Sequence, residues 1–179
     1  RTTPEEFAAR ADFPLRPSPF CKAAFVVEQP DFKPGRHPYH HAGVFYSQEP
    51  SASSAAPLLG VKPGMRVLDM CAAPGGKSFA AAIQMKDQGE IWSCDLHPHK
   101  KKLIANGAAR LGLDCVTPMT ADACVHRPEW EGAFDLVLVD APCSGLGVVR
   151  RKPEIKLHTY GKDLEHLADL QLQILETAA

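Results

Sequence analysis

Two stretches of the sequence combine acidic residues, a cysteine and closely spaced glycines, which are residue types able to bind a small ligand and to form covalent bonds. The first, VLDMCAAPGGKS, sets an aspartate and a cysteine before two adjacent glycines and a lysine. The second, DAPCSGLGVVRRK, begins at Asp140 and has Cys143 three residues later. A thiolate can act as a nucleophile and a carboxyl can exchange a proton, so both stretches could serve group-transfer chemistry.

Three classes of ligand could explain the glycine pair of the first stretch. A P-loop needs a glycine where this sequence has Cys71, and the dinucleotide fingerprint needs three spaced glycines where it has only Gly75 and Gly76. What remains is an open turn with exposed amides that could hold the carboxylate of S-adenosylmethionine. A glycine turn that binds no ligand is the competing interpretation.

The elements that must position these stretches alternate between strand and helix patterns after Gly64. Strands are expected at MRVLDM, GEIWSCD, DCVTPMT and FDLVLVDA, and helices at KSFAAAIQMKD, HKKKLIANGAARLG and DLEHLADLQLQILETAA. This alternation predicts an α/β fold, a doubly wound and mostly parallel sheet with helices on both faces. The last helix should present an apolar face made of Leu164, Leu167, Ala168, Ile174, Leu175 and Ala178.

Ligands of such sheets bind beyond the carboxyl ends of the strands, and an aspartate is expected at each of these ends: Asp69, Asp95, Asp122 and Asp140. Asp95 could accept hydrogen bonds from two ribose hydroxyls, with Lys100 near enough to touch the same edge of the ligand. Asp122 could accept from an adenine amino group. Together these features fit S-adenosylmethionine, although aspartates at strand ends also frequently cap the following helix.

The first 45 residues follow a different pattern. Thr3, Pro4 and Glu6 predict a capped short helix, and the proline-broken segments FPLRPSPF and AAFVVEQPDF predict a small sheet or hairpin. We therefore divide the chain into an N-terminal extension, residues 1–45, and a core, residues 46–179. At the boundary, Phe45 and Tyr46 are expected either to stack on the cofactor or a base or to pack in the core.

Composition excludes several classes of protein. The 179 residues are 45% hydrophobic and carry a formal net charge of -1, which suits one globular domain with a small appendage and gives no global attraction for nucleic acid. No apolar run approaches the ~20 residues of a membrane span, so no membrane partner is expected.

The six cysteines form no C-x-x-C pair and predict reduced thiols in the cytoplasm. His37, His40 and His41 lack a close cysteine, so we expect no metal site.

Three blocks of the sequence carry a family resemblance. DMCAAPGGKS resembles the cofactor loop of the Sun-type RNA cytosine-5 methyltransferases, the family of the bacterial ribosomal RNA enzymes RsmB and RsmF. DAPCSGLGVVRRKPEIK resembles that family's Asp-Ala-Pro-Cys-Ser-Gly block, and HPYHHAGVFYSQEPSA resembles the segment before its cofactor loop, in a form nearest to RsmF-like members. The resemblance runs from about Phe20 to the chain end. It implies a Rossmann-like methyltransferase that uses S-adenosylmethionine on RNA, with ribosomal RNA as the expected partner.

The resemblance also implies roles for single residues. Those expected to contact S-adenosylmethionine are Cys71, Ala72, Ala73, Pro74, Gly75, Gly76, Lys77, Asp95, Asp122 and Asp140. Cytosine C5 is a poor nucleophile, so a thiolate must first add to C6, and Asp140 would stabilise that adduct near N3. The family assigns the attack to a later Thr-Cys pair and product release to Cys143. DNA cytosine-5 enzymes use a Pro-Cys at this position as the nucleophile, which keeps the other role of Cys143 open.

The sequence departs from the family pattern near its end. No cysteine follows Cys143, and the Thr-Cys block and last strands of the family have no counterpart before Ala179. We interpret the chain as a catalytic domain truncated after the fourth strand and its following helix; a non-catalytic module that binds S-adenosylmethionine or RNA is the alternative. The strand at residues 134–139 would then have a long apolar edge able to self-associate. Arg150 and Arg151 are expected to contact the RNA backbone, with plain surface charge as the alternative.

Overall fold

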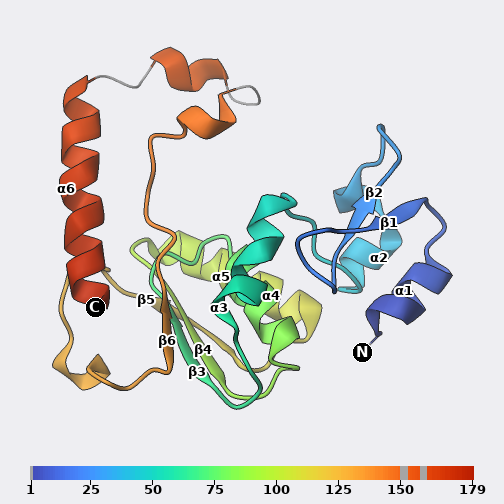
Figure 1. The fold of residues 1–179 in the computed structure, drawn as a ribbon, viewed down its shortest axis with the longest axis horizontal. Helices are drawn as coiled ribbons and strands as arrows, with labels where there is room; N and C mark the ends of the chain where they lie inside the picture. The colour runs from blue at the N-terminus through green and yellow to red at the C-terminus, as the bar shows by residue number, and fades with distance from the viewer. Residues whose placement is uncertain (1, 150–152, 158–160) are drawn as a thin grey trace.

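The computed structural model describes residues 2–149, 153–157 and 161–179. It contains a four-stranded parallel sheet, helices on its two faces, and a smaller N-terminal unit that lies beyond one helical layer (Figure 1).

The N-terminal unit begins with the predicted capped helix, α1 (Pro4–Arg10). The Thr3 hydroxyl accepts a hydrogen bond from the Glu6 amide at 3.2 Å, and the Glu6 carboxylate accepts one from the Thr3 amide at 3.0 Å. The predicted hairpin is also confirmed, because β1 (Leu15–Pro17) pairs antiparallel with β2 (Phe25–Val27). The short helices η1 (Pro34–Arg36) and α2 (Pro38–His41) complete the unit.

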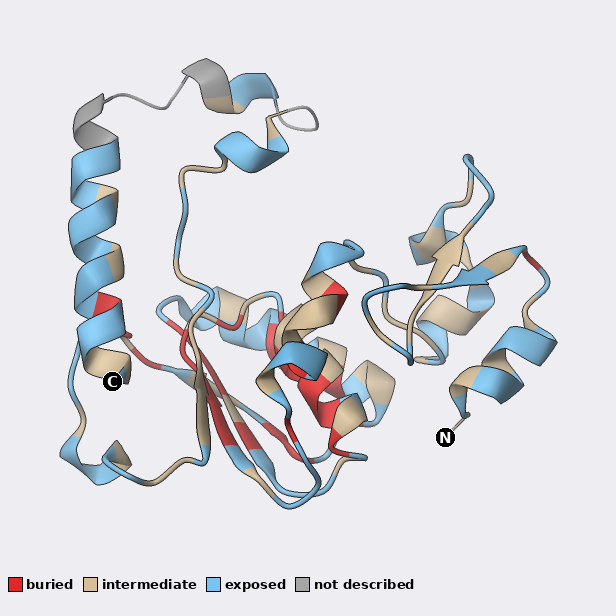
Figure 2. Ribbon diagram, viewed as in Figure 1, coloured by how far each residue is buried: buried red, intermediate tan, exposed pale blue. Residues whose placement is uncertain are grey.

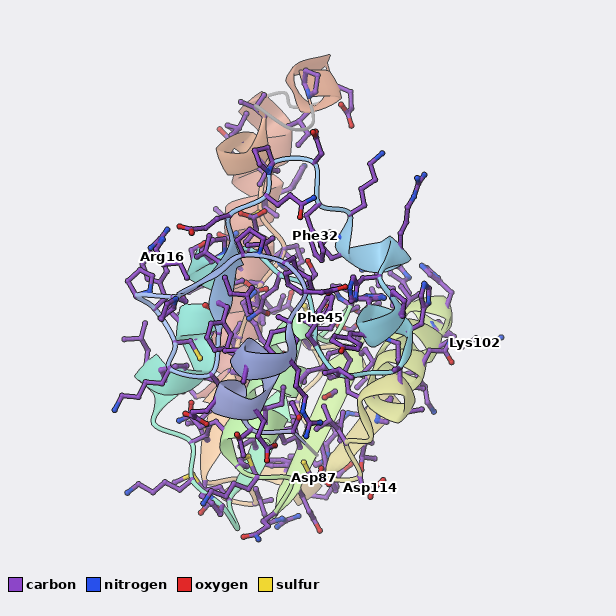
Figure 3. All side chains as sticks on the ribbon, turned by 90° about the vertical axis from the view of Figure 1, so that its right-hand side faces the viewer. Arg16, Phe32, Phe45, Asp87, Lys102 and Asp114 are labelled. Atoms are coloured by element: carbon purple, nitrogen blue, oxygen red, sulfur yellow. The ribbon has the colours of Figure 1, made fainter. Side chains whose placement is uncertain are left out.

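Aromatic rings hold this small unit together in place of a layered core. Phe13 packs against Phe32 with ring centroids 4.4 Å apart, and Phe7 packs against Phe45 at 5.9 Å. His37 joins the cluster at 5.1 Å from Phe13. Phe32 and Phe45 are labelled in Figure 3, which looks onto this unit. Rings of this size bury much apolar surface per residue, which allows about 45 residues to form a packed body.

The main sheet has the strand order β5-β4-β3-β6, and every neighbouring pair is parallel. Its strands are β3 (Arg66–Asp69), β4 (Glu90–Asp95), β5 (Val116–Thr120) and β6 (Leu136–Leu138). The predicted doubly wound α/β fold is therefore confirmed. The chain adds β4 and β5 on one side of β3 and then crosses to add β6 on the other side. This reversal makes a topological switch point, where a crevice opens beyond the carboxyl ends of β3 and β6.

Three helices cover one face of the sheet: α3 (Ala55–Leu59), α4 (Gly76–Gln84) and α5 (Pro98–Leu111), with η2 (Ser51–Ser54) leading into the first. Helix α5 ends where predicted, at Gly112, whose φ of 63° suits a left-handed cap. The two longer helices approach closely at Gly107, where a Cβ atom would come within 2.5 Å of the Phe79 ring. That ring is buried and fills the space between α4 and α5.

The other face is covered by η3 (Pro128–Trp130) and by the C-terminal end of α6 (Gly161–Ala178). The loop before α6 contains η4 (Leu146–Val148) and η5 (Pro153–Leu157). The predicted C-terminal helix is confirmed as α6, but only part of its apolar face is buried. Ile174 is buried, but Leu164, Ala168 and Leu175 are exposed, because most of α6 stands away from the sheet (Figures 1 and 2).

The strand predicted at residues 134–139 is shorter than expected. Ladder pairing covers only Leu136–Leu138, after which the chain leaves the sheet toward Pro142, which has no amide hydrogen to donate. Within the described ranges, β6 pairs with β3 alone and is therefore an edge strand. A three-residue edge is not the long apolar edge that we predicted, and self-association through it stays a prediction.

A buried carboxylate ends the central strand β3. The Asp69 side chain is 1% exposed, and its Oδ2 accepts a hydrogen bond of 2.6 Å from the Ser78 hydroxyl. The Ser93 hydroxyl of β4 in turn donates to Ser78 at 2.8 Å. Burial raises the pKa of Asp69 to about 6, and the Ser78 hydrogen bond opposes part of that rise.

Replacing Asp69 with Asn should remove a pH dependence of stability. The folded state holds the Asp69 proton more tightly than the unfolded chain, in which the pKa is near 3.8, so this contribution to stability is largest in acid and is lost as pH rises through about 6. Between about pH 4.5 and about pH 7.5, wild type should lose about 2 kcal/mol of unfolding free energy relative to Asp69→Asn. Urea unfolding at both pH values measures this difference.

Asp114→Asn is the matched control, because it makes the same chemical change at an exposed site (Figure 3). It should follow the wild-type pH dependence. A constant difference between wild type and Asp69→Asn across this pH range would contradict the role assigned to burial.

Candidate active site

A cavity of about 320 Å³ opens at the switch point between β3 and β6. Its walls come from three parts of the chain: the loop that follows β3, Asp140 after β6, and residues 46–49 with Ala52 from the segment before α3. The buried Asp69 also lines it. The two sequence motifs, far apart in the chain, therefore meet in one cavity.

The glycine pair allows the loop after β3 to turn directly into α4. Gly75 has a φ of 109°, and a Cβ at this position would lie 2.3 Å from the Phe79 ring. Gly76 begins α4, and a Cβ there would come within 3.2 Å of the Tyr46 ring. Position 75 therefore excludes a side chain, whereas a side chain at position 76 would require the Tyr46 ring to shift slightly. The first amides of α4 stay close to the cavity.

An ion pair joins the two motifs. The Lys77 ammonium donates to Oδ2 of Asp140, across 63 residues of sequence, and both side chains are partly exposed at the cavity. Lys77 also lowers the pKa of the buried Asp69, whereas Asp140 raises it. One ammonium thus lies near two carboxylates, and removing it would leave two negative groups facing one another.

Cys71 lines the cavity as a neutral thiol. Burial raises its pKa to about 11, and the nearby carboxylates of Asp69 and Asp95 add to the rise. A thiol with such a pKa is almost entirely protonated near neutral pH and is a poor nucleophile. The cysteine of the first motif therefore serves as part of the wall, and any thiolate chemistry must come from another cysteine.

Asp95 and Asp122 lie at the carboxyl ends of β4 and β5, as predicted, but the lining of this cavity among the described residues includes neither of them, nor Gly75. Oδ1 of Asp95 accepts from the His97 amide at 3.1 Å and lies 3.5 Å from the Lys100 ammonium. Oδ1 of Asp122 accepts from the Cys124 amide at 2.9 Å. Each aspartate thus accepts a hydrogen bond within its own turn. The alternative considered from the sequence, that Asp95 caps the following helix, is not what the structure shows, because the N-cap residue of α5 is His97.

The second motif is divided between the cavity and the surface. Asp140 lines the cavity, whereas Cys143 is exposed and is absent from the cavity lining among the described residues. The Gln171 side chain of α6 donates to the Pro142 carbonyl at 2.6 Å and so ties this loop to the last helix. Arg150 and Arg151, predicted to contact RNA, lie outside the described residues.

One wall of the cavity was only partly expected from the sequence, which offered Tyr46 as a residue that stacks on the cofactor but did not single out residues 47–49. Residues 46–49 line it, and the Tyr46 ring packs edge-on against Phe79 with centroids 5.2 Å apart. Tyr46 therefore packs on the core while facing the cavity, and burial raises its pKa. Phe45 instead packs into the aromatic cluster of the N-terminal unit. The change from VFY to SQEPSA was the available signal, since a ring followed by polar residues suits the rim of a cavity.

A second cavity, of about 520 Å³, lies on the α6 side of the sheet. Its walls include Trp130, Phe134 and residues 176–179, and neither motif stretch from 71–77 or 140–143 contributes to it.

Over the described ranges, no group of three or more His, Cys, Asp or Glu side chains could hold a metal ion. Likewise, no helix within these ranges is long and apolar enough to cross a membrane.

Family comparisons cover nearly the whole chain. Residues 56–179 match the family described as 16S rRNA methyltransferase RsmB/F. Residues 1–50 match the N-terminal domain of 16S rRNA methyltransferase RsmF.

Curated relatives extend from bacteria to mammals. The Probable ribosomal RNA small subunit methyltransferase B of Bacillus subtilis is 47% identical over 133 residues, which are 74% of this chain and 30% of that protein. The ribosomal RNA small subunit methyltransferase F of Serratia proteamaculans is 34% identical over 93% of this chain and 36% of its own length. The human 28S rRNA (cytosine(4447)-C(5))-methyltransferase is 36% identical over 89% of this chain and 20% of its own length. The chain thus spans 20–36% of the length of these three relatives.

Two solved structures from Pyrococcus horikoshii resemble the fold over most of this chain. A methyltransferase homolog protein from Pyrococcus horikoshii superposes with a TM-score of 0.82 at 27% identity, over 99% of this chain and 56% of that one. NSun6 from the same organism, crystallised with the S-adenosylmethionine analogue SFG, gives a TM-score of 0.72 at 27% identity over 87% of this chain and 40% of its own. With the parallel sheet and the two motifs that meet at its switch point, these matches show that the chain belongs to the RsmB/F family of 16S rRNA methyltransferases.

Proposed function

We propose that the protein is an S-adenosylmethionine-dependent RNA (cytosine-5) methyltransferase that acts on ribosomal RNA, and that this chain supplies its cofactor site and the catalytic Asp140. The observation that carries the proposal is the cavity in which the DMCAAPGGKS loop and Asp140 come together. The relatives are named as ribosomal RNA methyltransferases, which supports this activity over a binding module without chemistry. We also propose the division at residues 45 and 46 and a cytoplasmic location, which the six free thiols suit.

The residues around the cavity fit S-adenosylmethionine. Oδ1 of the buried Asp69 accepts no hydrogen bond of normal geometry from any residue that the structure describes, so an amino group in the cavity would satisfy it. The N-terminal amides of α4, left accessible by Gly75 and Gly76, would bind a carboxylate. In this proposal Asp95, with Lys100 beside it, binds the ribose hydroxyls and Asp122 binds the adenine.

The chain's own residues then have distinct tasks. When bound, S-adenosylmethionine supplies an electrophilic methyl group. Asp140 lies at the cavity beside Lys77. In this proposal its carboxyl carries a proton when the base is bound and donates a hydrogen bond to N3, which stabilises the negative charge that develops once a thiolate has added to C6. We assign that thiolate to the Thr-Cys pair that the family resemblance implies, and we assign release of the methylated product to Cys143. The high pKa of Cys71 argues against a nucleophilic role for that residue.

The cofactor assignment predicts selective binding by the purified chain. Calorimetry should detect saturable binding of S-adenosylmethionine and none of NAD or ATP. Lys77→Met should weaken that binding at least about tenfold, because Asp69 and Asp140 would then face the cavity without their shared cation. Lys102→Met, an exposed lysine of α5 (Figure 3), is the control and should bind as wild type does. Binding of NAD or ATP in place of S-adenosylmethionine would overturn the assignment.

The two roles considered for Cys143 predict opposite behaviour of Cys143→Ser in the whole protein. If Cys143 releases the product, the variant should still attack C6 and accumulate a covalent protein–RNA adduct while turnover stops. A denaturing gel of enzyme incubated with radiolabelled ribosomal RNA and S-adenosylmethionine detects this adduct. Cys21→Ser, which changes a thiol of the N-terminal unit, should turn over normally. If Cys143→Ser forms neither adduct nor product, Cys143 is the nucleophile and our assignment is wrong.

The RNA contact predicted for Arg150 and Arg151 can be tested by charge reversal. Reversing both charges to Glu in the whole protein should weaken ribosomal RNA binding roughly tenfold or more and reduce its salt dependence, because fewer phosphate counterions are released. Filter binding at two salt concentrations measures this effect, and calorimetry should show unchanged S-adenosylmethionine affinity. An equal loss of both affinities would indicate misfolding and remove the support for an RNA-binding role.

A further inference from the structure

The cavity wall formed by residues 46–49 directly follows a point where neighbouring side chains pack on different parts of the molecule. The Phe45 ring packs against Phe7 and Phe13 in the N-terminal unit, with centroids 5.9 and 6.3 Å away. The next ring, that of Tyr46, packs against Phe79 of α4 and lines the cavity. The position of this wall therefore depends on how the N-terminal unit is attached to the sheet domain.

Arg110, in the last turn of α5, makes that attachment. Its Nη1 donates to the His40 carbonyl at 2.6 Å and to the Phe45 carbonyl at 3.3 Å. Its guanidinium carbon lies 6.0 Å from the centroid of the Tyr46 ring. One half-buried side chain of the sheet domain thus contacts three residues, at both ends of the turn that enters the cavity wall.

The backbone of the same residue contacts the same segment. A Cβ on Gly43, whose φ is 72°, would lie 1.7 Å from the Arg110 carbonyl oxygen. Gly43 is therefore packed directly on the end of α5, with no room for a side chain. Burial lowers the pKa of the neighbouring His40, and the positive charge of Arg110 lowers it further, so this imidazole favours the neutral form. The contact with Arg110 is thus made by carbonyl groups and rings, and it needs no ion pair.

We propose that Arg110 is a positioning residue that holds residues 46–49 against the glycine turn, so that the N-terminal unit and the cofactor cavity are coupled through α5. The inference rests on the proposed function for the identity of the ligand but not for the coupling itself. Both hydrogen bonds come from a single nitrogen, Nη1, so a lysine ammonium could replace them in part. A lysine would not replace the planar guanidinium near the Tyr46 ring. Arginine is therefore required for the full effect.

The coupling predicts a specific pattern of cofactor affinity. In this chain, Arg110→Ala should raise the dissociation constant for S-adenosylmethionine about tenfold, and Arg110→Lys should give an intermediate value. Arg66→Ala is the matched control: Arg66 also lies near aromatic rings, Trp92 and Phe134, and pairs with Glu90, but at the amino end of β3. Its loss should leave the affinity unchanged even where it lowers stability. Calorimetry with each variant measures these values.

Hydrogen exchange by mass spectrometry separates positioning from general destabilisation. Without ligand, Arg110→Ala should exchange faster in residues 43–52 and in the N-terminal unit, while β3 and β4 keep wild-type protection. In wild type, binding of S-adenosylmethionine should slow hydrogen exchange in residues 43–52 and in the N-terminal unit. Faster exchange across the whole sheet, or unchanged affinity in Arg110→Ala, would overturn the proposal. If wild type binds no S-adenosylmethionine, the proposed function fails, and the exchange pattern without ligand still decides whether Arg110 couples the two parts.

Discussion

The reversal of strand order at β3 is the constraint on which the rest of this structure depends. Because β3 pairs in parallel with both β4 and β6, the connections that leave these strands diverge, and the space between them stays open. The glycine turn has to enter α4 within that space, and Asp140 reaches it from the other side. The ion pair between Lys77 and Asp140 is then a direct result of topology, since two short loops that flank one switch point bring their polar ends together.

Two acidic groups that line the cavity, Asp69 and Cys71, have raised pKa values. Cys71 is neutral at the pH of a cell, and Asp69, with a pKa of about 6, changes charge close to that pH. The Ser78 hydroxyl donates to this carboxyl group and itself accepts a hydrogen bond from the Ser93 hydroxyl. A polar ligand that brings a positive group to Asp69 would fix the ionised form, so ligand binding and proton release are linked at the floor of the cavity.

Much of the fold could be predicted because its signals are local. Buried parallel strands give short apolar runs, Gly112 ends α5, and the Thr3 and Glu6 pair caps α1 within four residues. The features that were not predicted share a different cause, which is non-local. The shortness of β6, the exposure of most of α6 and the position of residues 47–49 all depend on contacts between distant parts of the chain, which local patterns specify weakly. The Arg110 contact spans 70 residues of sequence and was invisible for the same reason. Asp95 and Asp122 were found at the right strand ends, but only the structure revealed the turn hydrogen bonds that they accept.

The Phe79 ring fills the space of two side chains that are missing, those of Gly75 in the motif loop and Gly107 in α5. Substitutions at these three positions therefore depend on one another, and the order in which they occur matters. A smaller residue at position 79 would make room for alanine at position 107, whereas alanine at 107 introduced first would collide with the ring. Position 75 gains nothing from such a change, because its backbone conformation, with a φ of 109°, disfavours any side chain. Related sequences should therefore vary at 79 and 107 together while keeping glycine at 75, a pattern of paired change that lies inside the helix packing and outside the chemistry of the site.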